Sequence, residues 1–270
     1  MEYSKKKIMN KVLLAIPVYN EEKHLDAVMD EVGHYIDNVV VIDDGSTDNS
    51  REILARRRDV CVVSHKHNCG YGSSIIHTFQ FAQGCGFDWV ITMDCDLQHE
   101  PRQIPSFLEA IEDDNADIIS GSRYLDRSLQ TDCPPPERRQ INEIITKLIH
   151  DKLQLRLTDS FCGFKACRVS SMAKLQLQEK GYAFPLEFWA QVAYHQLRIR
   201  EIPIKLIYND PNRHFGGELD DHDTRLEHYK KVLDNALNLP PERANKPPHK
   251  IIKPFTAYRK QCEIPQNEII

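Results

Sequence analysis

Two aspartates separated by one residue are the side chains best suited to chemistry in this sequence. Val90 to Pro101 reads VITMDCDLQHEP, so an apolar run leads directly into Asp94 and Asp96. If a strand continued through this stretch, both carboxylates would point to one side and Cys95 to the other. Converging carboxylates repel each other, and a hard divalent cation such as Mg²⁺ or Mn²⁺ relieves that repulsion. Gln98 adds a neutral oxygen, and such a metal would hold a diphosphate and stabilise it as it leaves.

Two further segments place polar residues where a strand should end. Residues 17–21 (PVYNE) follow one apolar run, and residues 43–46 (DDGS) follow another. Ligands of open parallel sheets bind beyond the carboxyl ends of the strands, so all three polar ends should lie along one rim. One such end often only caps the next helix, but three together predict a ligand site. The first strand is followed by neither G-x-G-x-x-G nor G-K-[ST], which disfavours a dinucleotide-binding or P-loop protein.

Apolar segments that alternate with amphipathic ones predict the elements that position these residues. The expected strands are residues 11–16, 38–42, 60–63, 89–93 and 117–120. Helical spacing of apolar residues marks the segments 25–36, 50–57, 75–82 and 105–111. Strands that are apolar throughout and alternate with helices predict an α/β fold. We expect a Rossmann-like, mostly parallel central sheet with helices on both faces.

The second half of the chain has a less regular pattern. A loop, a helix, a strand and a final helix are expected at residues 131–137, 138–153, 199–207 and 224–239, respectively. Pro203 cannot donate a backbone hydrogen bond, so its strand should lie at an edge of the sheet or carry a bulge. Prolines and charges dominate residues 240–270. We therefore expect one domain over residues 1–239, followed by a loosely packed tail.

Composition disfavours several classes of protein. The net charge of -5 argues against a nucleic-acid-binding protein that works by bulk electrostatics. The eight cysteines form no C-x-x-C pair, which disfavours a structural zinc site, and their scatter indicates reduced thiols in a cytoplasmic protein. No apolar run approaches the roughly 18 residues of a membrane span. We expect a soluble protein that meets membranes, if at all, at their surface; its oligomeric state stays open.

Five motifs in this order resemble those of one enzyme family: IPVYNEE, VIDDGSTD, HNCGYGSSI, MDCDLQHEP and GSRY. Their order and spacing resemble family 2 glycosyltransferases with the GT-A fold, above all the branch of polyprenyl-phosphate (dolichol-phosphate) mannosyl- and glucosyltransferases. The resemblance covers residues 11–229. It implies an inverting transferase that moves a hexose from GDP-mannose or UDP-glucose to a polyprenyl phosphate, with Mg²⁺ or Mn²⁺ as cofactor.

The resemblance also implies roles for individual residues. The nucleotide would contact Pro17, Tyr19, Asn20, Glu21, Asp43, Asp44, Gly72 and Asp94. The metal would be held by Asp94, Asp96 and Gln98. The catalytic residues would be Asp96, Arg123 and Glu187. The phosphate groups, including that of the acceptor, would face Arg123, Arg138 and Arg213.

The acceptor and the activity have alternatives. After Arg213 the family usually continues with serine and lysine, whereas here the acidic run 218–221 follows. A phosphate acceptor needs cations to hold it, but a hydroxyl acceptor needs a general base, for which Glu187 is the obvious candidate. We favour the phosphate. A nucleotide-sugar-binding module without turnover is a third interpretation, and a sugar-nucleotide pyrophosphorylase is disfavoured because the first strand lacks a Gly-rich phosphate loop.

Several side chains also have interpretations that involve no ligand. Glu187 could be a buried carboxylate that pairs with Arg198 or another base. His65 and His99 are expected at the solvated surface, as lone histidines usually are. Arg138 could simply begin a solvated helix.

Overall fold

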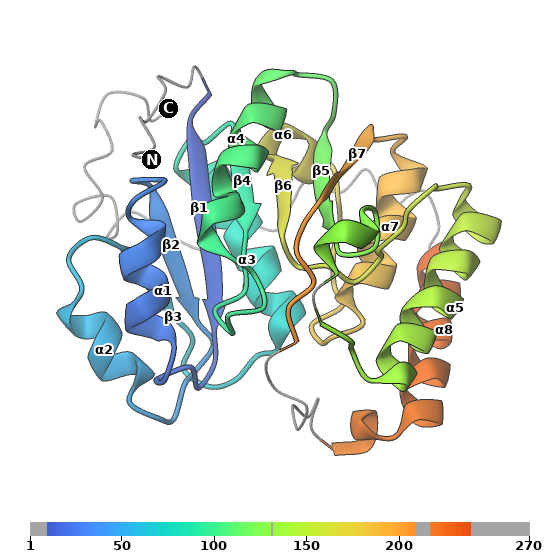
Figure 1. The fold of residues 1–270 in the computed structure, drawn as a ribbon, viewed down its shortest axis with the longest axis horizontal. Helices are drawn as coiled ribbons and strands as arrows, with labels where there is room; N and C mark the ends of the chain where they lie inside the picture. The colour runs from blue at the N-terminus through green and yellow to red at the C-terminus, as the bar shows by residue number, and fades with distance from the viewer. Residues whose placement is uncertain (1–9, 131, 209–216, 239–270) are drawn as a thin grey trace.

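The computed structural model of the protein describes residues 10–130, 132–208 and 217–238. Within these ranges seven strands form one sheet in the order β3-β2-β1-β4-β6-β5-β7 (Figure 1). The strands are β1 (Val12–Val18), β2 (Val39–Asp43), β3 (Cys61–Ser64), β4 (Trp89–Thr92), β5 (Ile118–Ser122), β6 (Lys165–Arg168) and β7 (Ile199–Pro203). Among them β6 alone runs antiparallel to its neighbours, β4 and β5. The predicted α/β fold with a mostly parallel sheet is therefore confirmed.

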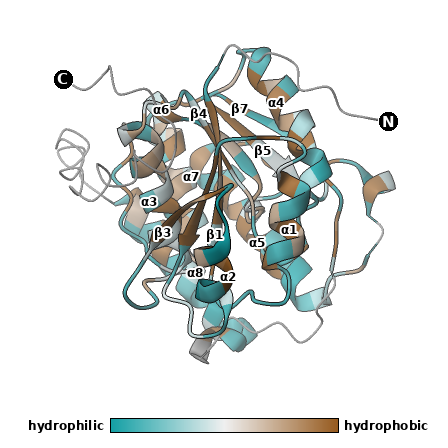
Figure 2. Cartoon of the chain, turned by 90° about the vertical axis from the view of Figure 1, so that its left-hand side faces the viewer, coloured by the Kyte–Doolittle hydropathy of each residue, from teal (hydrophilic) through white to brown (hydrophobic). Residues whose placement is uncertain are grey.

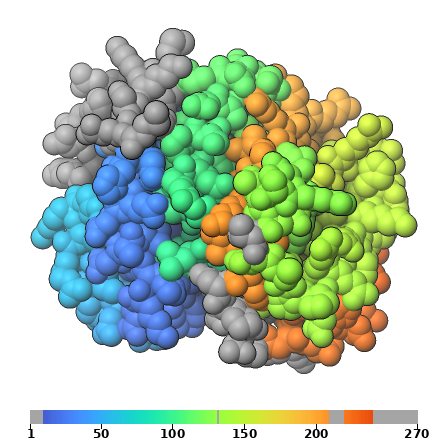
Figure 3. Space-filling model, in the orientation of Figure 1, coloured from blue at the N-terminus to red at the C-terminus, as the bar shows by residue number. Residues whose placement is uncertain are grey.

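Helices cover both faces of this sheet, as the sequence predicts (Figures 1 and 2). The α-helices are α1 (Leu25–Val32), α2 (Ser50–Arg56), α3 (Tyr71–Gly84), α4 (Ile104–Glu112), α5 (Pro136–Leu153), α6 (Val169–Met172), α7 (Phe184–Tyr194) and α8 (His222–Leu237). Short 3-10 turns occupy Pro101–Gln103, Arg127–Leu129 and Gly217–Asp220. Figure 3 shows that the first elements of the chain (blue) and α5 and α8 (yellow-green and orange) lie on opposite sides of the molecule.

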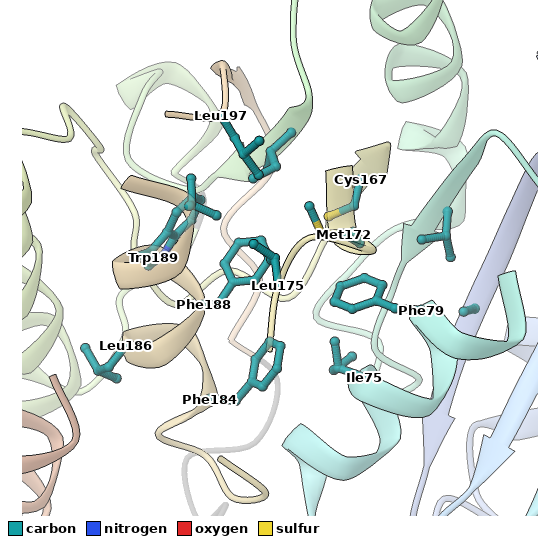
Figure 4. Packing of buried hydrophobic residues seen from close by; sticks show 14 of the residues in the cluster. Ile75, Phe79, Cys167, Met172, Leu175, Phe184, Leu186, Phe188, Trp189 and Leu197 are labelled. Atoms are coloured by element: carbon teal, nitrogen blue, oxygen red, sulfur yellow. The ribbon is translucent and has the colours of Figure 1, made fainter. Parts of the chain in front are cut away.

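Alternate residues of the central strands bury the two faces of the sheet. Leu13 and Ala15 of β1 pack in the core formed with α3 and α5 to α8, whereas Leu14 and Ile16 pack in the core formed with α1, α2 and α4. This division follows from the strand period of two, and each fully buried aliphatic side chain contributes about 1.5–3 kcal/mol. Figure 4 shows part of the first core, where side chains of α3, α6 and α7 meet.

Three differences between the structure and the expected elements bear on the site and on the second half of the chain. β4 ends at Thr92, so Asp94 and Asp96 lie in the following turn and not on a strand, and Leu97 in that turn has a φ of 61°. β6, α6 and α7 were not expected. The last strand, β7, is the edge strand that Pro203 predicts, but it ends at this residue and not at 207.

The predicted C-terminal boundary of the domain lies outside the described residues. The position 239 and the tail 240–270 lie outside the described residues, so the division into one domain and a tail stays a prediction. Among the helices that the structure describes, none has both the length and the apolar character that a membrane span requires.

Candidate active site

A cavity of about 440 Å³ lies at the carboxyl ends of β1, β2 and β4. Its wall on the other side comes from the end of β5, the loop before β6, and α5, α7 and α8. The lining includes most of the predicted site residues: Pro17, Tyr19, Glu21, Asp44, Asp94, Asp96, Gln98, Arg123 and Arg138. The three polar strand ends therefore meet on one rim, as the topology of a parallel sheet requires.

Three predicted nucleotide-binding residues do not line the cavity and support its loops instead. Asn20, with a φ of 58°, accepts hydrogen bonds from two backbone N–H groups of the loop after β2, at 2.8 and 3.3 Å. Asp43 is fully buried and accepts a hydrogen bond from Arg51 Nε at 2.9 Å. A Cβ atom on Gly72 would lie 2.2 Å from the carbonyl oxygen of Glu179, so this glycine lets α3 approach the loop before α7. Arg213 lies outside the described residues.

The turn that carries Asp94 is held by a buried histidine. The backbone N–H of Asp94 donates to Nδ1 of His99 at 3.0 Å, so that ring nitrogen carries no proton. His99 is buried, which contradicts its expected place at the surface. Burial lowers the pKa of His99 to about 4, although Asp94 acts in the opposite direction. A Cβ atom on Gly163 would lie 2.6 Å from Asp94 Oδ2 and 2.8 Å from Tyr71 Oη, so the loop before β6 supports this turn closely.

Asp94, Asp96 and Gln98 form a donor set that fits a hard divalent cation. Both aspartates are half-buried and line the cavity, whereas Cys95 between them is buried. The predicted alternation is therefore kept although the strand has ended. Gln98 Nε2 is buried without a hydrogen-bond partner among the described residues, and a half-turn of the amide would present its oxygen there. Two carboxylates and an amide oxygen suit Mg²⁺ or Mn²⁺ and leave places for phosphate oxygens.

Asp44 anchors a second polar group at the rim. Its Oδ1 accepts hydrogen bonds from His65 Nδ1 at 2.6 Å and from the Cys69 N–H at 2.8 Å, and its Oδ2 accepts one from the Gly70 N–H at 2.9 Å. The ligand atoms of Asp44, His65 and Cys69 all lie within 4.8 Å of one another. His65 Nε2 lies 2.6 Å from Nδ1 of His77 on α3. The expectation that His65 is solvated is wrong, because its side chain is only 8% exposed.

Arginines line the opposite side of the cavity. Nε and Nη2 of Arg123 donate to the two carboxylate oxygens of Asp159 at 2.6 and 2.9 Å. Asp159 is fully buried; burial alone would raise the pKa of its carboxyl, but Arg123 lowers that pKa overall. The guanidinium of Arg138 lies 5.3 Å from the ring centroid of Tyr208. Arg123 thus has a partner that the motifs did not reveal.

A third arginine on this side was missed by the sequence analysis. Arg225 of α8 is buried, lines the cavity and donates from Nη1 to the carbonyl oxygen of Leu219 at 2.8 Å. Tyr229, one turn later, also lines the cavity, and burial raises its pKa to about 12. Arg225 shares the four-residue spacing of the buried positions Tyr229 and Leu233. A charged residue in the apolar stripe of a helix is the signal that could have found it.

Glu187, the candidate general base, does not line the cavity. It is buried in α7 and accepts hydrogen bonds from the backbone N–H groups of Gln178 and Glu179 at 2.8 and 2.7 Å. The suggested pair with Arg198 is wrong, because Arg198 Nε donates to Asp117 Oδ2 at 3.0 Å. Glu187 therefore fastens the loop before α7.

Comparison with known proteins places this site in a family. Residues 14–176 match the model of Glycosyl transferase family 2. The chain belongs to glycosyltransferase family 2. This glycosyltransferase is 29% identical over 219 residues to the UDP-N-acetylglucosamine–dolichyl-phosphate N-acetylglucosaminyltransferase of Methanococcus voltae, covering 74% of this chain and 86% of that one. It is also 29% identical over 206 residues to the undecaprenyl-phosphate mannosyltransferase of Micrococcus luteus, covering 73% and 84%.

Solved structures confirm the fold of this glycosyltransferase. Glucosyl-3-phosphoglycerate synthase from Mycobacterium tuberculosis in complex with UDP matches with a TM-score of 0.67, at 18% identity, over 87% of this chain and 82% of that one. The same synthase has also been solved with Mn²⁺, UDP and phosphoglyceric acid, and that structure matches equally well, with a TM-score of 0.67 and 17% identity. The GT-A fold predicted by the motifs is thus confirmed.

Proposed function

We propose that this glycosyltransferase moves a hexose from a nucleotide-diphosphate sugar to a polyprenyl phosphate, with inversion at the anomeric carbon. The observation that carries the proposal is that carboxylates and arginines reach the cavity from different elements. Asp94 and Asp96 follow β4, whereas Arg123, Arg138 and Arg225 come from the end of β5, from α5 and from α8. A phosphate acceptor is already ionised, so it needs cations and no general base. The relatives from M. voltae and M. luteus, whose names include dolichyl and undecaprenyl phosphate, support this acceptor.

The donor would occupy the rim formed by the ends of β1, β2 and β4. Tyr19 is 43% exposed there and offers a ring face to the base, while Asp44 offers a carboxylate. Asp94, Asp96 and Gln98 would hold Mg²⁺ or Mn²⁺, which when bound neutralises the diphosphate as it leaves. GDP-mannose and UDP-glucose are the expected donors.

The transfer would be a single displacement. A phosphate oxygen of the acceptor attacks the anomeric carbon, the new C–O bond forms, and the bond to the donor diphosphate breaks on the opposite face. Arg138 and Arg225 would hold the acceptor phosphate in line with that bond, and Arg123, fixed by Asp159, would lower its charge repulsion with the donor. Glu187 would have no proton to remove, which agrees with its place beneath the loop before α7.

The lipid tail of such an acceptor would bring the enzyme to the cytoplasmic surface of a membrane. Leu125, which is 43% exposed, directly follows Tyr124, a residue that lines the cavity, so it offers an apolar side chain to a membrane surface near this segment. We propose that the protein associates peripherally with this surface. We propose no nucleic acid as a partner. Recovery of the protein with anionic vesicles at low salt and its release at high salt would check the association.

A transfer assay tests the proposed function. The purified protein is incubated with Mn²⁺, a radiolabelled GDP- or UDP-hexose and short-chain polyprenyl phosphate in detergent, and the organic phase is counted. We expect a labelled lipid whose sugar is released by mild acid, and none with the matched polyprenol, which lacks the phosphate. Transfer to the polyprenol or to a soluble sugar would instead indicate a hydroxyl acceptor. Nucleotide binding without transfer or slow donor hydrolysis would indicate a binding module.

A further inference from the structure

The carboxylate of Asp44 already accepts three hydrogen bonds from the protein. Cys69 N–H and His65 Nδ1 donate to Oδ1 at 2.8 and 2.6 Å, and Gly70 N–H donates to Oδ2 at 2.9 Å. An ionised carboxylate has about four acceptor positions on its two oxygens. One position therefore remains for a ligand, and it lies on Oδ2. Asp44 is only 4% exposed, and its exposure is to the cavity that it lines.

The hydrogen bond from His65 is fixed by the residues around it. A carboxylate cannot donate, so Nδ1 of His65 must carry the proton whether the ring is neutral or charged. Nε2 of His65 lies 2.6 Å from Nδ1 of His77, and this contact fixes the His65 ring on the side away from Asp44. Burial is the main cause that lowers the pKa of His77, and the neighbouring His65 lowers it further. Asp44 acts to raise this pKa, and Lys180 acts to lower it. His77 is therefore a neutral support for His65 at pH 7.

The two backbone donors are equally fixed. Gly45, next to Asp44, has a φ of 75°, and a Cβ atom there would lie 2.3 Å from the carbonyl carbon of His67. Gly70 has a φ of 96°, and a Cβ atom there would lie 2.3 Å from the carbonyl oxygen of Lys180. The backbone on both sides of Asp44 is thus closely packed, which keeps the two N–H donors in place around its carboxylate.

Nucleotide bases differ in what they offer to such a carboxylate. Uracil presents one imide N–H, which needs one acceptor. Guanine presents N1–H and an N2 amino hydrogen side by side, a pair that needs two carboxylate acceptors. Adenine and cytosine present a ring nitrogen lone pair, which a carboxylate repels. We propose that the Asp44–His65–His77 chain leaves Asp44 a single acceptor and so selects a uridine diphosphate donor over a guanosine diphosphate donor; this rests on the proposed function for the presence of a nucleotide at the rim.

Calorimetric titration of the full-length protein with UDP and with GDP, each with Mn²⁺ and without acceptor, tests the inference. We expect UDP to bind at least about tenfold more tightly, the effect of one unmade hydrogen bond to a charged group. Equal or tighter binding of GDP would overturn the inference and leave the proposed function intact, since GDP-hexose could still be the donor. Binding of neither nucleotide would overturn both.

Two substitutions of His65 show whether the histidine chain causes the preference. His65→Leu removes the donor and returns one acceptor position on Oδ1, so the ratio of GDP to UDP dissociation constants should fall at least about fivefold. His65→Asn is the matched variant, because its amide nitrogen can replace Nδ1 and should retain most of the preference. An unchanged ratio in His65→Leu, with an unchanged melting temperature, would exclude a role for the chain. The UDP-to-GDP ratio of the parent decides the base preference itself even if His65→Leu fails to fold.

Discussion

The donor side and the acceptor side of the cavity are held in different ways. On the donor side, Asp44 is fixed largely by backbone N–H groups, and the Asp94 turn by a neutral histidine. On the acceptor side, Arg123 is fixed by an ion pair with Asp159, which is fully buried. Neutral donors orient a carboxylate without cancelling its charge, whereas an ion pair makes an arginine part of the fold. Substitutions should therefore cost mainly activity on the donor side, and stability as well on the acceptor side.

Asp96→Ala should give the largest loss of activity. Transfer should fall at least about a thousandfold, about 4 kcal/mol in activation free energy, because the donor diphosphate loses its metal. The melting temperature should move by no more than about 2 °C, since the change removes repulsion with Asp94. Asp151→Ala, which removes an exposed carboxylate of α5, is the control and should behave like the parent. Parent-like binding of nucleotide with Mn²⁺ by Asp96→Ala would exclude this residue from the metal site.

Arg123→Ala should give the largest loss of stability. The free energy of unfolding, measured by urea denaturation, should fall by about 3–5 kcal/mol, because Asp159 is left buried without its partner. Adding Asp159→Asn should recover much of that loss, since it removes the unpaired charge. Transfer should stay low in the double variant if Arg123 also acts on the phosphate groups. An Arg123→Ala variant that is inactive but as stable as the parent would mean that the Arg123–Asp159 pair does not stabilise the fold, so that the acceptor side would not differ from the donor side in this respect.

Gly163 lies where the loop before β6 meets the Asp94 turn, so Gly163→Ala affects the contact between the two sides. Its effect on activity should be smaller than that of Asp96→Ala. The new Cβ atom would lie 2.6 Å from Asp94 Oδ2, so the carboxylate must move. A displacement of this size should lower kcat by about a hundredfold while the protein stays folded. Gly33→Ala is the control, because a Cβ atom there would lie 3.7 Å from its nearest neighbours, the carbonyl oxygens of Met29 and Asp30. Full activity of Gly163→Ala would show that the Asp94 turn does not need the loop before β6.

The two sides also differ in how far the sequence predicts them. Asp44, Asp94 and Asp96 follow strands whose apolar runs are easily recognised, and parallel topology alone brings such ends to one rim. The pairing of Asp159 with Arg123 could not be predicted in this way. The two residues are 36 positions apart, and Asp159 lies in the loop before β6, a strand that the sequence did not predict. Four residues of β6 are too few to show a period, and its antiparallel direction has no signal in its own residues.

Burial of single polar residues is the other part that the sequence did not predict. His65 and His99 lie in segments whose composition is typical of surface loops. The side chain of His65 is buried because α3 packs over it, and that of His99 because the loop before β6 packs over it. Arg225 lies in the buried stripe of α8, but an arginine in a helix as polar as this one is usually solvent-exposed, so the sequence did not predict its burial. Local pattern therefore predicts which strand ends carry the site, while tertiary packing decides which neighbouring residues complete it.

Glu187→Gln should have the smallest effect, and it tests whether the acceptor side contains a base. Burial raises the pKa of the Glu187 carboxyl, although the two backbone hydrogen bonds oppose this. The stability that its protonated form contributes is complete below the unfolded-state pKa and is lost as pH rises through the folded-state pKa. Glutamine keeps a neutral acceptor for the N–H groups of Gln178 and Glu179 at every pH. The variant should therefore gain stability relative to the parent as pH rises above the usual pKa of a glutamate, about 4.

The same variant should keep transfer within about tenfold of the parent, because a phosphate acceptor brings its own negative charge. Loss of a general base would cost about a hundredfold or more and would remove the acidic limb of the pH–rate profile. Glu109→Gln, an exposed carboxylate on α4, controls for the change of net charge. A dead Glu187→Gln beside an active Arg123→Lys would mean a hydroxyl acceptor. In that case the loop before α7 would have to move to bring Glu187 to the cavity, and the arginines would hold only the donor diphosphate.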